Sequence, residues 1–333
     1  MLAWLRAEGS HRDIGLALGR WGAEACHGHL LRSSAWAGVQ RWRGSAEAAA
    51  MRAHVEQAFP WIMDELSGLA EGLGLPLEDV FLWNCRGDLW AMAPDGCTTV
   101  LAAARLSHNE DGDPGFAGRC GLVDLRPPDG PAFVSFVYPG SIPGHTFAVN
   151  DAGLAMTVNN IRARRAPPGM PRMVLTRAVL TLGTPTDAVA LLRAHPRAGA
   201  FHLGIGTAGG DATYSVEFSS ETVSAERVAA GRRVHANHAI HALQAGLSQV
   251  VTASSRHRQA RGDALLAQGT EALDILADQG DAAEPIYRNS AADTDDENTM
   301  ATADIDLGGP LAAWTVQAPP GDIRFRFEGI RRL

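Results

Sequence analysis

The sequence predicts an α+β fold, because helical and strand-like patterns occupy different parts of the chain. Between residues 11 and 92, apolar residues recur at the spacing of amphipathic helices. Beyond Cys97 the pattern changes to short runs rich in β-branched and aromatic residues, separated by turn residues. Two helical stretches interrupt these runs. Helices inserted between sets of antiparallel strands favour layers of helices and sheets around a common core.

The first region is expected to form helices around residues 14–21, 51–69 and 80–90. Seven of the eight tryptophans precede residue 91, and such side chains cover large apolar areas. Residues 1–96 are therefore expected to be a helical segment that packs on residues 97–333, so that the two parts form one compact unit.

The later elements are expected from apolar runs and from the turns that bound them. Strands are expected at residues 98–103, 132–137, 146–149, 154–158, 201–205, 214–218, 222–228, 232–234, 299–307, 312–316 and 323–327. Helices are expected at residues 174–180, 187–194 and 252–277. Residues 204–209 match a dinucleotide-binding fingerprint, but a strand-like run follows where a helix is needed, so we interpret them as a hairpin turn.

Composition and charge exclude several classes of function. Of the 333 residues 46% are apolar and 20% charged, which is typical of a globular protein. The net charge of −8 and the scattered arginines argue against a nucleic-acid partner, since phosphates require a basic face. No apolar run approaches the roughly 18 residues that span a bilayer. We therefore expect a cytoplasmic protein with a small-molecule partner and no membrane partner.

Cys97 is the most informative residue, because it follows a turn-like Asp95-Gly96 pair and opens an apolar run. A cut between Gly96 and Cys97 would place a thiol and a free α-amine on one residue. An α-amine with a pKa of about 7.7–8.0 can accept a proton from a thiol of about 8.5. Gly96 suits such a cut, since a residue without Cβ lets the thiol approach its carbonyl. Taken alone, Cys97 also fits an inert core cysteine.

A series of short motifs runs along nearly the whole chain. These motifs are Gly15 and Gly19 around Leu16-Ala17-Leu18, Gly96-Cys97-Thr98-Thr99, Asn109-Glu110-Asp111, Asn150-Asp151-Ala152-Gly153-Leu154, Asn159-Asn160, His235-Ala236-Asn237-His238, Ser254-Ser255-Arg256, Thr299-Met300-Ala301-Thr302 and Ala318-Pro319-Pro320-Gly321. In this order they resemble the acyl-coenzyme A:isopenicillin N acyltransferase family of N-terminal nucleophile (Ntn) hydrolases. Each motif is weak alone, but the shared order favours Cys97 as a nucleophile.

The resemblance implies a precursor that cleaves itself between Gly96 and Cys97. The products would be a small chain, 1–96, and a catalytic chain, 97–333, which stay associated. The resemblance also implies a four-layer αββα sandwich and no cofactor. Such an enzyme would hydrolyse or transfer acyl groups of small amides through a Cys97 thioester, with acyl-coenzyme A or an amino-acyl amide as a candidate donor. Whether water or a second amine intercepts the thioester depends on what the pocket admits.

Roles for further residues follow from the same resemblance. Asp111 would accept a hydrogen bond from the ammonium or the thiol, and Arg256 would pair with Asp111. Asn237 would donate its side-chain amide to the oxyanion, with the backbone N–H near Asn160 as the second donor. Thr99 would orient the nucleophile's strand. From the residues alone, Asp111 is equally a turn residue before Gly112, Arg256 a surface arginine and Thr99 an ordinary strand residue.

The sequence departs from the family pattern beside Asn109. Glu110 replaces an aromatic residue, and His108 stands where a neutral amide is common. We therefore take His108, Asn109 and Glu110 as candidate substrate-binding residues and expect Glu110 and His108 at the rim of the pocket. A carboxylate and an imidazole there would favour polar or cationic groups, such as those of histamine-like or amino-acyl amides.

Two alternatives stay open. His235, His238 and His241, with His257 as a possible fourth ligand, would bind zinc if they lay on one helix face, although residues 234–237 continue a strand-like run. The protein would then be a zinc-dependent amidohydrolase. A non-catalytic binding protein with the same fold is the other alternative. The acidic run at residues 293–297 is expected to be a solvated loop, because like charges repel.

Overall fold

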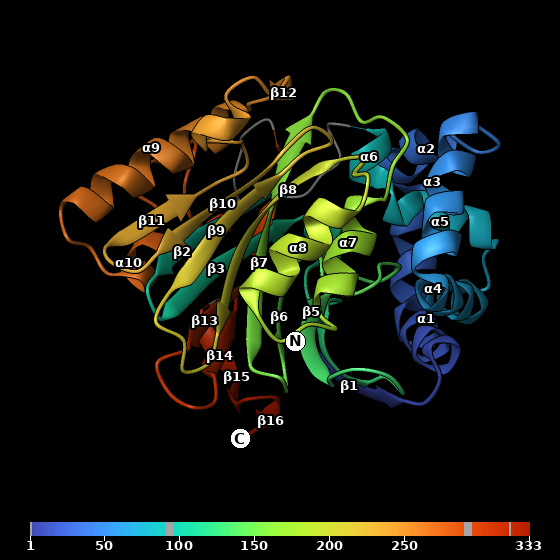
Figure 1. Ribbon diagram of the computed structural model, residues 1–333, viewed down its shortest axis with the longest axis horizontal. Coiled ribbons are helices and arrows are strands. Elements are labelled where there is room, and N and C mark those ends of the chain that lie inside the picture. Colours follow the sequence, from blue (N-terminus) through green and yellow to red (C-terminus); the bar gives the residue numbers. More distant parts are fainter. Residues whose placement is uncertain (1, 91–95, 290–294, 320) are drawn as a thin grey trace.

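The structure is a computed structural model that describes residues 2–90, 96–289, 295–319 and 321–333. The turn expected at Asp95 and the first part of the acidic run at 293–297 therefore lie outside the described residues. The described chain contains two β-sheets with helices packed against them, which agrees with the expected α+β class (Figure 1).

One sheet has nine strands. In spatial order these are β1 (Ala3–Glu8), β4 (Gly121–Arg126), β5 (Phe133–Val137), β6 (Phe147–Asn150), β7 (Leu154–Ala163), β8 (Ala200–Thr207), β9 (Thr213–Phe218) and β10 (Val223–Val228), with β12 (Gln249–Val250) paired to β7. The other sheet has seven strands. These are β11 (Arg232–His235), β2 (Gly96–Ala102), β3 (Arg105–Gly112), β13 (Asn298–Asp306), β14 (Ala313–Ala318), β15 (Asp322–Glu328) and β16 (Arg331–Arg332).

The two sheets face each other, and their inner faces form most of the core. Strands β2 and β3 contact β7, β8 and β9 of the other sheet. Leu101 and Leu106 are fully buried at this contact, where their side chains approach Gly204 of β8. A larger residue at Gly204 would overlap with Thr157 and crowd both leucines, so this glycine lets the sheets approach closely.

Helices cover the outer faces of the sheets. Helices α9 (Ala253–Ala267) and α10 (Ala272–Leu276) contact β11, β2 and β3, and share a small apolar core with Val100 and Val234. Helix α8 (Pro185–Ala194) contacts β8, β9 and β10, and α7 (Arg172–Val179) packs beside it. The expected helix at 252–277 is thus two helices.

Six helices precede Gly96 and gather at the end of the molecule opposite α9 (Figure 1). They are α1 (His11–Gly28), α2 (Ser34–Gln40), α3 (Ala46–Ala58), α4 (Pro60–Leu73), α5 (Leu77–Asn84) and α6 (Arg86–Leu89). Pro60 begins α4, so the helix expected at 51–69 is also divided in two. The backbones of α1 and α4 approach so closely that a Cβ on Gly15 or Gly68 would overlap with the other helix.

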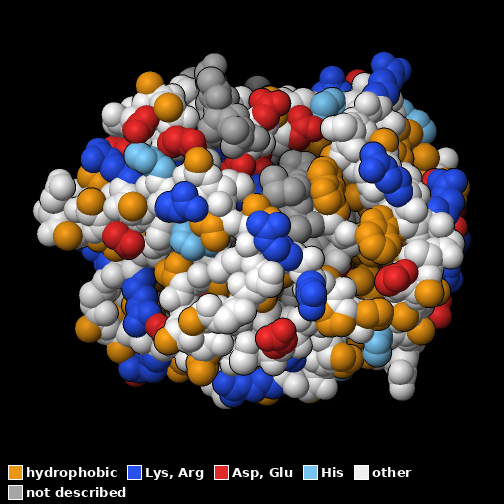
Figure 2. Space-filling model, turned by 90° about the horizontal axis from the view of Figure 1, so that it is seen from above, with side chains coloured by type: hydrophobic (Ala, Val, Ile, Leu, Met, Phe, Trp, Pro, Cys, Tyr) orange, Lys and Arg blue, Asp and Glu red, His pale blue; other side chains and the backbone are white. Residues whose placement is uncertain are grey.

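The segment before Gly96 is not only helical, because β1 pairs in parallel with β4 at the edge of the nine-stranded sheet. Besides β1, the sequence analysis missed β3, β4, the two-residue strands β12 and β16, and helix α2. The match to a dinucleotide fingerprint falls in β8 and its hairpin to β9, as expected. No helix among the described residues is long and apolar enough to cross a membrane. On the face drawn in Figure 2, arginine and acidic side chains are interspersed, with no stripe of one sign.

Candidate active site

Cys97 is the second residue of β2, and its side chain points into the space between the two sheets. The residue is only 3% exposed. The Nδ2 group of Asn237 donates to its sulfur at 3.2 Å, and the backbone N–H of Asn160 also donates to the thiol. Burial raises the pKa of this thiol well above its usual value, and the charge of Glu110, when ionised, adds to the effect. The Cys97 side chain is therefore a shielded, protonated thiol.

Asn237 follows β11, and four hydrogen bonds of its side-chain amide, one of them to the Cys97 sulfur, fix the orientation of that amide. Its Oδ1 accepts from the backbone N–H of Cys97 at 3.0 Å and from Nη2 of Arg258 at 2.7 Å. Its backbone N–H donates to Ser255 Oγ at 3.0 Å, and its Nδ2 also donates to the carbonyl of Asn160. Because Oδ1 accepts from two donors, Nδ2 must face the sulfur. Two N–H donors thus converge on Sγ, next to the position where the oxygen of an acyl group bonded to the sulfur would take up negative charge.

The arginine that contacts this group is Arg258, not Arg256. Arg258 is fully buried in α9, and its Nη1 donates to the carbonyl of Cys97 at 2.6 Å and to Thr98 Oγ1 at 2.9 Å. Arg256 is exposed. Two residues along a helix turn the side chain by about 200°, so only one of these arginines can face β2. The predicted pairing of Arg256 with Asp111 is therefore wrong, and the sequence analysis missed Arg258, although it stands two positions away.

Asp111 is a strand residue of β3, so the alternative of a turn residue is also wrong. It lies directly opposite Gly96 and points to the helix-covered side of the sheet, away from the thiol. Its Oδ1 accepts from Thr299 Oγ1 at 2.7 Å, and Nη1 of Arg288 lies 3.9 Å from its Oδ2. Asp111 is thus beside the peptide bond that precedes Cys97 and not beside the sulfur.

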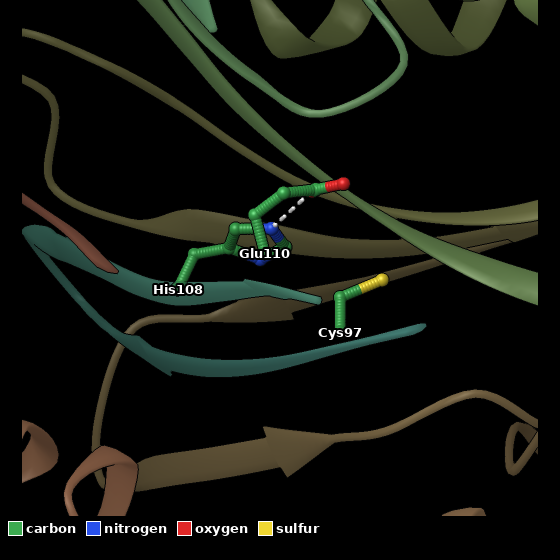
Figure 3. Close-up of side chains that lie close together, drawn as sticks. All are labelled: Cys97, His108 and Glu110. Carbon is green, nitrogen blue, oxygen red and sulfur yellow. Dashed lines mark hydrogen bonds and ion pairs between the residues drawn. The ribbon is translucent and has the colours of Figure 1, made fainter. Parts of the chain in front are cut away.

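His108 and Glu110 lie with Cys97 between the sheets (Figure 3). The register places Glu110 opposite Cys97 and His108 opposite Thr99, and opposite residues of an antiparallel pair share a face. The sulfur, a ring nitrogen of His108 and a carboxylate oxygen of Glu110 all lie within 4.8 Å of one another. His108 Nε2 is 3.1 Å from Glu110 Oε2, and burial lowers the pKa of His108 to about 3. The expectation that both residues stand at a pocket rim is wrong, since both are buried.

Thr99 contributes to this buried group, whereas Asn109 does not. Thr99 Oγ1 lies 2.8 Å from His108 Nδ1 and 2.7 Å from Asn159 Oδ1. Asn109 points to the opposite face, where it donates to the carbonyl of Leu276 in α10 and accepts from Thr302. The structure therefore separates Asn109 from the nucleophile, because side chains alternate along a strand.

Glu297 is a buried residue of this region that the sequence analysis missed. The acidic run was expected to be solvated, yet the Glu297 side chain is fully buried against Gly96, where a Cβ on the glycine would overlap with Glu297 Oε2. Arg288 Nη1 donates to Glu297 at 2.7 Å, and Arg162 Nη2 lies 3.4 Å away. Burial raises the pKa of Glu297 to about 7 against the opposing effect of the two arginines. No pattern in the sequence indicates these partners.

The histidines of the zinc alternative do not converge on one point. His235 Nε2 contacts Glu217 at 2.8 Å, and His241 lies between Ser215 and Ser224. His238 contacts Ser255, and His257 lies 3.4 Å from Asp281 at the surface. Among the described residues, donor atoms lie close enough together to bind a metal in a different group, which consists of Cys97, His108 and Glu110. The strand-like pattern at residues 234–237 therefore predicted the geometry better than the helical spacing.

Comparison with known proteins found a family model and a curated relative that resemble this chain. A curated relative from Drosophila melanogaster, named β-alanyl-dopamine/carcinine hydrolase, is 25% identical over 218 residues. The match covers 57% of this chain and 56% of the relative, so the chain spans little more than half of the relative's length. The family model for acyl-coenzyme A:6-aminopenicillanic acid acyl-transferase matches residues 101–319. Since this range is more than half of the chain, the protein belongs to that acyltransferase family.

Proposed function

We propose that the protein is an autoproteolytic Ntn hydrolase or acyltransferase that cleaves itself between Gly96 and Cys97. The mature enzyme would then hydrolyse or transfer acyl groups of small amides through a Cys97 thioester. The observation that carries this proposal is the pair of N–H donors, from Asn237 and Asn160, that converge on the sulfur. The family match begins after Cys97, so it supports the acyl-transfer chemistry and leaves the nucleophile to be argued from this geometry.

In the proposed mechanism, Cys97 attacks the amide carbonyl while its own α-amine accepts the thiol proton. The oxyanion forms between Nδ2 of Asn237 and the backbone N–H of Asn160. Arg258 keeps Asn237 in this orientation, since it donates to the amide oxygen. The α-amine then donates its proton to the leaving amine, and water or a second amine releases the acyl group. We infer that the sheets and their covering helices form the four-layer αββα sandwich of the Ntn hydrolases.

The shielded thiol of the intact chain supports the idea of an inactive precursor. Its high pKa and its 3% exposure both disfavour attack on a substrate from outside. Cleavage would replace the peptide bond before Cys97 with a free amine and would release Gly96 from the site. The two chains would remain together, because β1 pairs with β4 and Glu65 of α4 pairs with Arg177 of α7 inside the core.

Small amino-acyl amides are the substrate class that we propose. The Drosophila relative is named for the hydrolysis of a β-alanyl amide. A β-alanyl group carries an ammonium two carbons from its carbonyl, and a carboxylate near the nucleophile would bind it. Glu110 lies within 4.8 Å of the sulfur and is placed to do so. In cleaved Glu110→Ala, activity that is retained on a β-alanyl amide as fully as on a purely apolar acyl amide would contradict this assignment.

Denaturing electrophoresis and N-terminal sequencing test the cleavage. Two fragments, the larger beginning at Cys97, are expected for the natural chain and a single intact chain for Cys97→Ala. All 29 basic residues are arginine, so the chain contains no lysine. In an untagged protein the primary amines are therefore the α-amines, and cleavage raises their number from one to two. An aldehyde probe that forms a thiazolidine would label only an N-terminal cysteine. An intact chain that loses its amidase activity to a chelator would instead support the zinc alternative.

A further inference from the structure

We propose that Glu110 and His108 form a proton relay that removes the thiol proton of Cys97 during self-cleavage. This inference rests on the proposed function. In the mature enzyme the α-amine can accept that proton, but in the intact chain the same nitrogen is part of a peptide bond. It donates its hydrogen to Asn237 Oδ1 at 3.0 Å and has no basic lone pair. Self-cleavage therefore needs a different proton acceptor.

The groups around the sulfur divide into donors and acceptors. Asn237 Nδ2 and the backbone N–H of Asn160 both donate to Sγ, so neither can take its proton. Asp111 is close in sequence, but it points to the other face of the sheet. Glu110 and His108 lie on the sulfur's own face, can accept a proton, and each place a donor or acceptor atom within 4.8 Å of the sulfur (Figure 3). Catalytic hydrogen bonds are often long before the reaction and shorten in the reacting state.

The surrounding hydrogen bonds determine which nitrogen of His108 carries its proton. Asn159 Nδ2 donates to the backbone carbonyl of His235 at 3.1 Å, so Asn159 Oδ1 must face Thr99. An amide oxygen only accepts, and Thr99 therefore uses its single hydrogen on Asn159. The 2.8 Å contact between Thr99 and His108 then requires a hydrogen on His108 Nδ1. Uncharged His108 consequently has its lone pair on Nε2.

That lone pair faces Glu110 Oε2 at 3.1 Å, and the contact needs one hydrogen between the two atoms. The pair thus holds a single proton. Burial lowers the pKa of His108, so the relay starts with an uncharged imidazole, and we place the shared proton on the carboxyl group of Glu110 in the intact chain. A carboxylic acid can accept a proton on one oxygen while it donates from the other.

The transfer of protons balances without any further reactant. Glu110 takes the proton from the thiol of Cys97 and passes its own proton to Nε2 of His108, which leaves a thiolate and an imidazolium. The thiolate attacks the carbonyl of Gly96, and the C–N bond to Cys97 breaks as the C–S bond forms. The proton returns from His108 through Glu110 to the released nitrogen, which becomes the α-amine. Water then hydrolyses the thioester between Gly96 and Cys97.

Thr99 and Asn159 act as positioning residues in this relay, since they determine the tautomer of His108 without contact with the reacting atoms. Thr99→Val removes the hydroxyl that accepts from Nδ1. The proton of His108 is then free to move to Nε2, which would block the relay. Self-cleavage of Thr99→Val is therefore expected to slow, and Thr99→Ser, which retains the hydroxyl, is expected to restore it.

The experiment follows the rate at which freshly made precursor gains an N-terminal cysteine, measured by thiazolidine labelling and mass spectrometry. General acid–base groups contribute about 10²–10⁴-fold to a rate, so Glu110→Gln is expected to cleave at least about 100-fold more slowly than the natural chain. Glu110→Asp is expected to recover part of the loss. Glu328→Gln, on the exposed strand β15, is the matched control and is expected to cleave at the natural rate.

A second variant protects the test against loss of folding. If Glu110→Gln proves insoluble, His108→Gln carries the same expectation, because its amide cannot take up the relayed proton. A natural chain that stays intact would refute the proposed self-cleavage itself. A natural chain that cleaves while soluble Glu110→Gln or His108→Gln cleaves equally fast would refute the relay alone. In cleaved Glu110→Gln the α-amine serves as the base. On a purely apolar acyl amide, which carries no ammonium for Glu110 to bind, the fold decrease in the hydrolysis rate should therefore be at least about 10-fold smaller than the fold decrease in the self-cleavage rate.

Discussion

Replacement of Asn237 by alanine is the sharpest test of the oxyanion site. The variant loses the Nδ2 group that donates to the sulfur at 3.2 Å, and Arg258 loses the amide oxygen that it contacts at 2.7 Å. The backbone N–H of Asn160 would remain as the second donor. Loss of one oxyanion donor typically costs about 10²–10³-fold in kcat, or about 2.7–4 kcal/mol. We therefore expect kcat for amide hydrolysis to fall by about that factor, with a much smaller change in KM.

The assay uses fully cleaved enzyme and a chromogenic β-alanyl anilide, with rates normalised to the amount of Cys97 that forms a thiazolidine. Asn109→Ala is the matched control. It removes the same amide from the opposite face of the neighbouring strand, where Asn109 contacts α10. The control is expected to lower thermal stability and to retain the natural kcat. A decrease of less than about 5-fold in Asn237→Ala, or an equal decrease in both variants, would refute the reasoning.

Three further predictions concern neighbouring residues. Gly96→Ala would place a Cβ against Glu297 Oε2, so we expect it to lose about 1–3 kcal/mol of stability in thermal unfolding and to cleave more slowly; natural stability and cleavage would show that the packing is looser. Arg258→Gln is expected to lower kcat about 10–100-fold through loss of charged hydrogen bonds, whereas exposed Arg256→Gln should retain natural activity, and the opposite ranking would restore the role predicted for Arg256. Burial alone would raise the pKa of Glu65, but Arg177 and His11 outweigh burial and lower this pKa. The stabilisation that ionised Glu65 provides is therefore complete above the unfolded pKa of about 4.3 and is lost as the pH falls through the lower folded pKa. Size-exclusion chromatography of the cleaved protein should therefore show the two chains together at neutral pH and separated only in acid. In Arg177→Met the chains should separate at neutral pH, because the variant leaves a buried carboxylate unpaired at a cost of about 3–5 kcal/mol.

Sequence patterns predicted most of the strands whose buried residues are apolar, but they missed β3, whose buried residues are mostly polar. Strands such as β5 and β8 were expected from their apolar runs. Strand β3 was not predicted because its polar run resembles a turn in the sequence. The structure nevertheless buries all four residues of that run, which are His108, Asn109, Glu110 and Asp111. The pattern failed here for a physical reason: these side chains are paired with partners from distant parts of the chain, and no local periodicity records such pairing.

The candidate site shows the same division between what is local and what is not. The resemblance identified Cys97, Asn160 and Asn237, which the structure brings together across separations of 77 and 140 residues. The choice between Arg256 and Arg258 depended on the rotation of α9, which the sequence does not indicate because the buried face of this helix is mostly polar. The burial of Glu297 depended on Arg162, which is 135 residues away. Partners of this kind become visible only once the sheets are assembled.

The alternation of side chains along β2 and β3 would divide the chemistry of the proposed self-cleavage between two faces of one sheet. Cys97 points toward the other sheet, as do Thr99, His108 and Glu110, which form the proposed relay to its thiol. Gly96 and Asp111 belong to the opposite face, where Glu297 and Arg288 pack against the residue that cleavage would release. Arg258 meanwhile contacts the carbonyl of Cys97, on the side of the residue that stays in the catalytic chain. Because these contacts do not involve Gly96, scission of the peptide bond would leave the thiol, its two N–H donors and its neighbouring carboxyl group in place. The same arrangement can therefore serve first the cleavage of the chain and then the hydrolysis of a substrate.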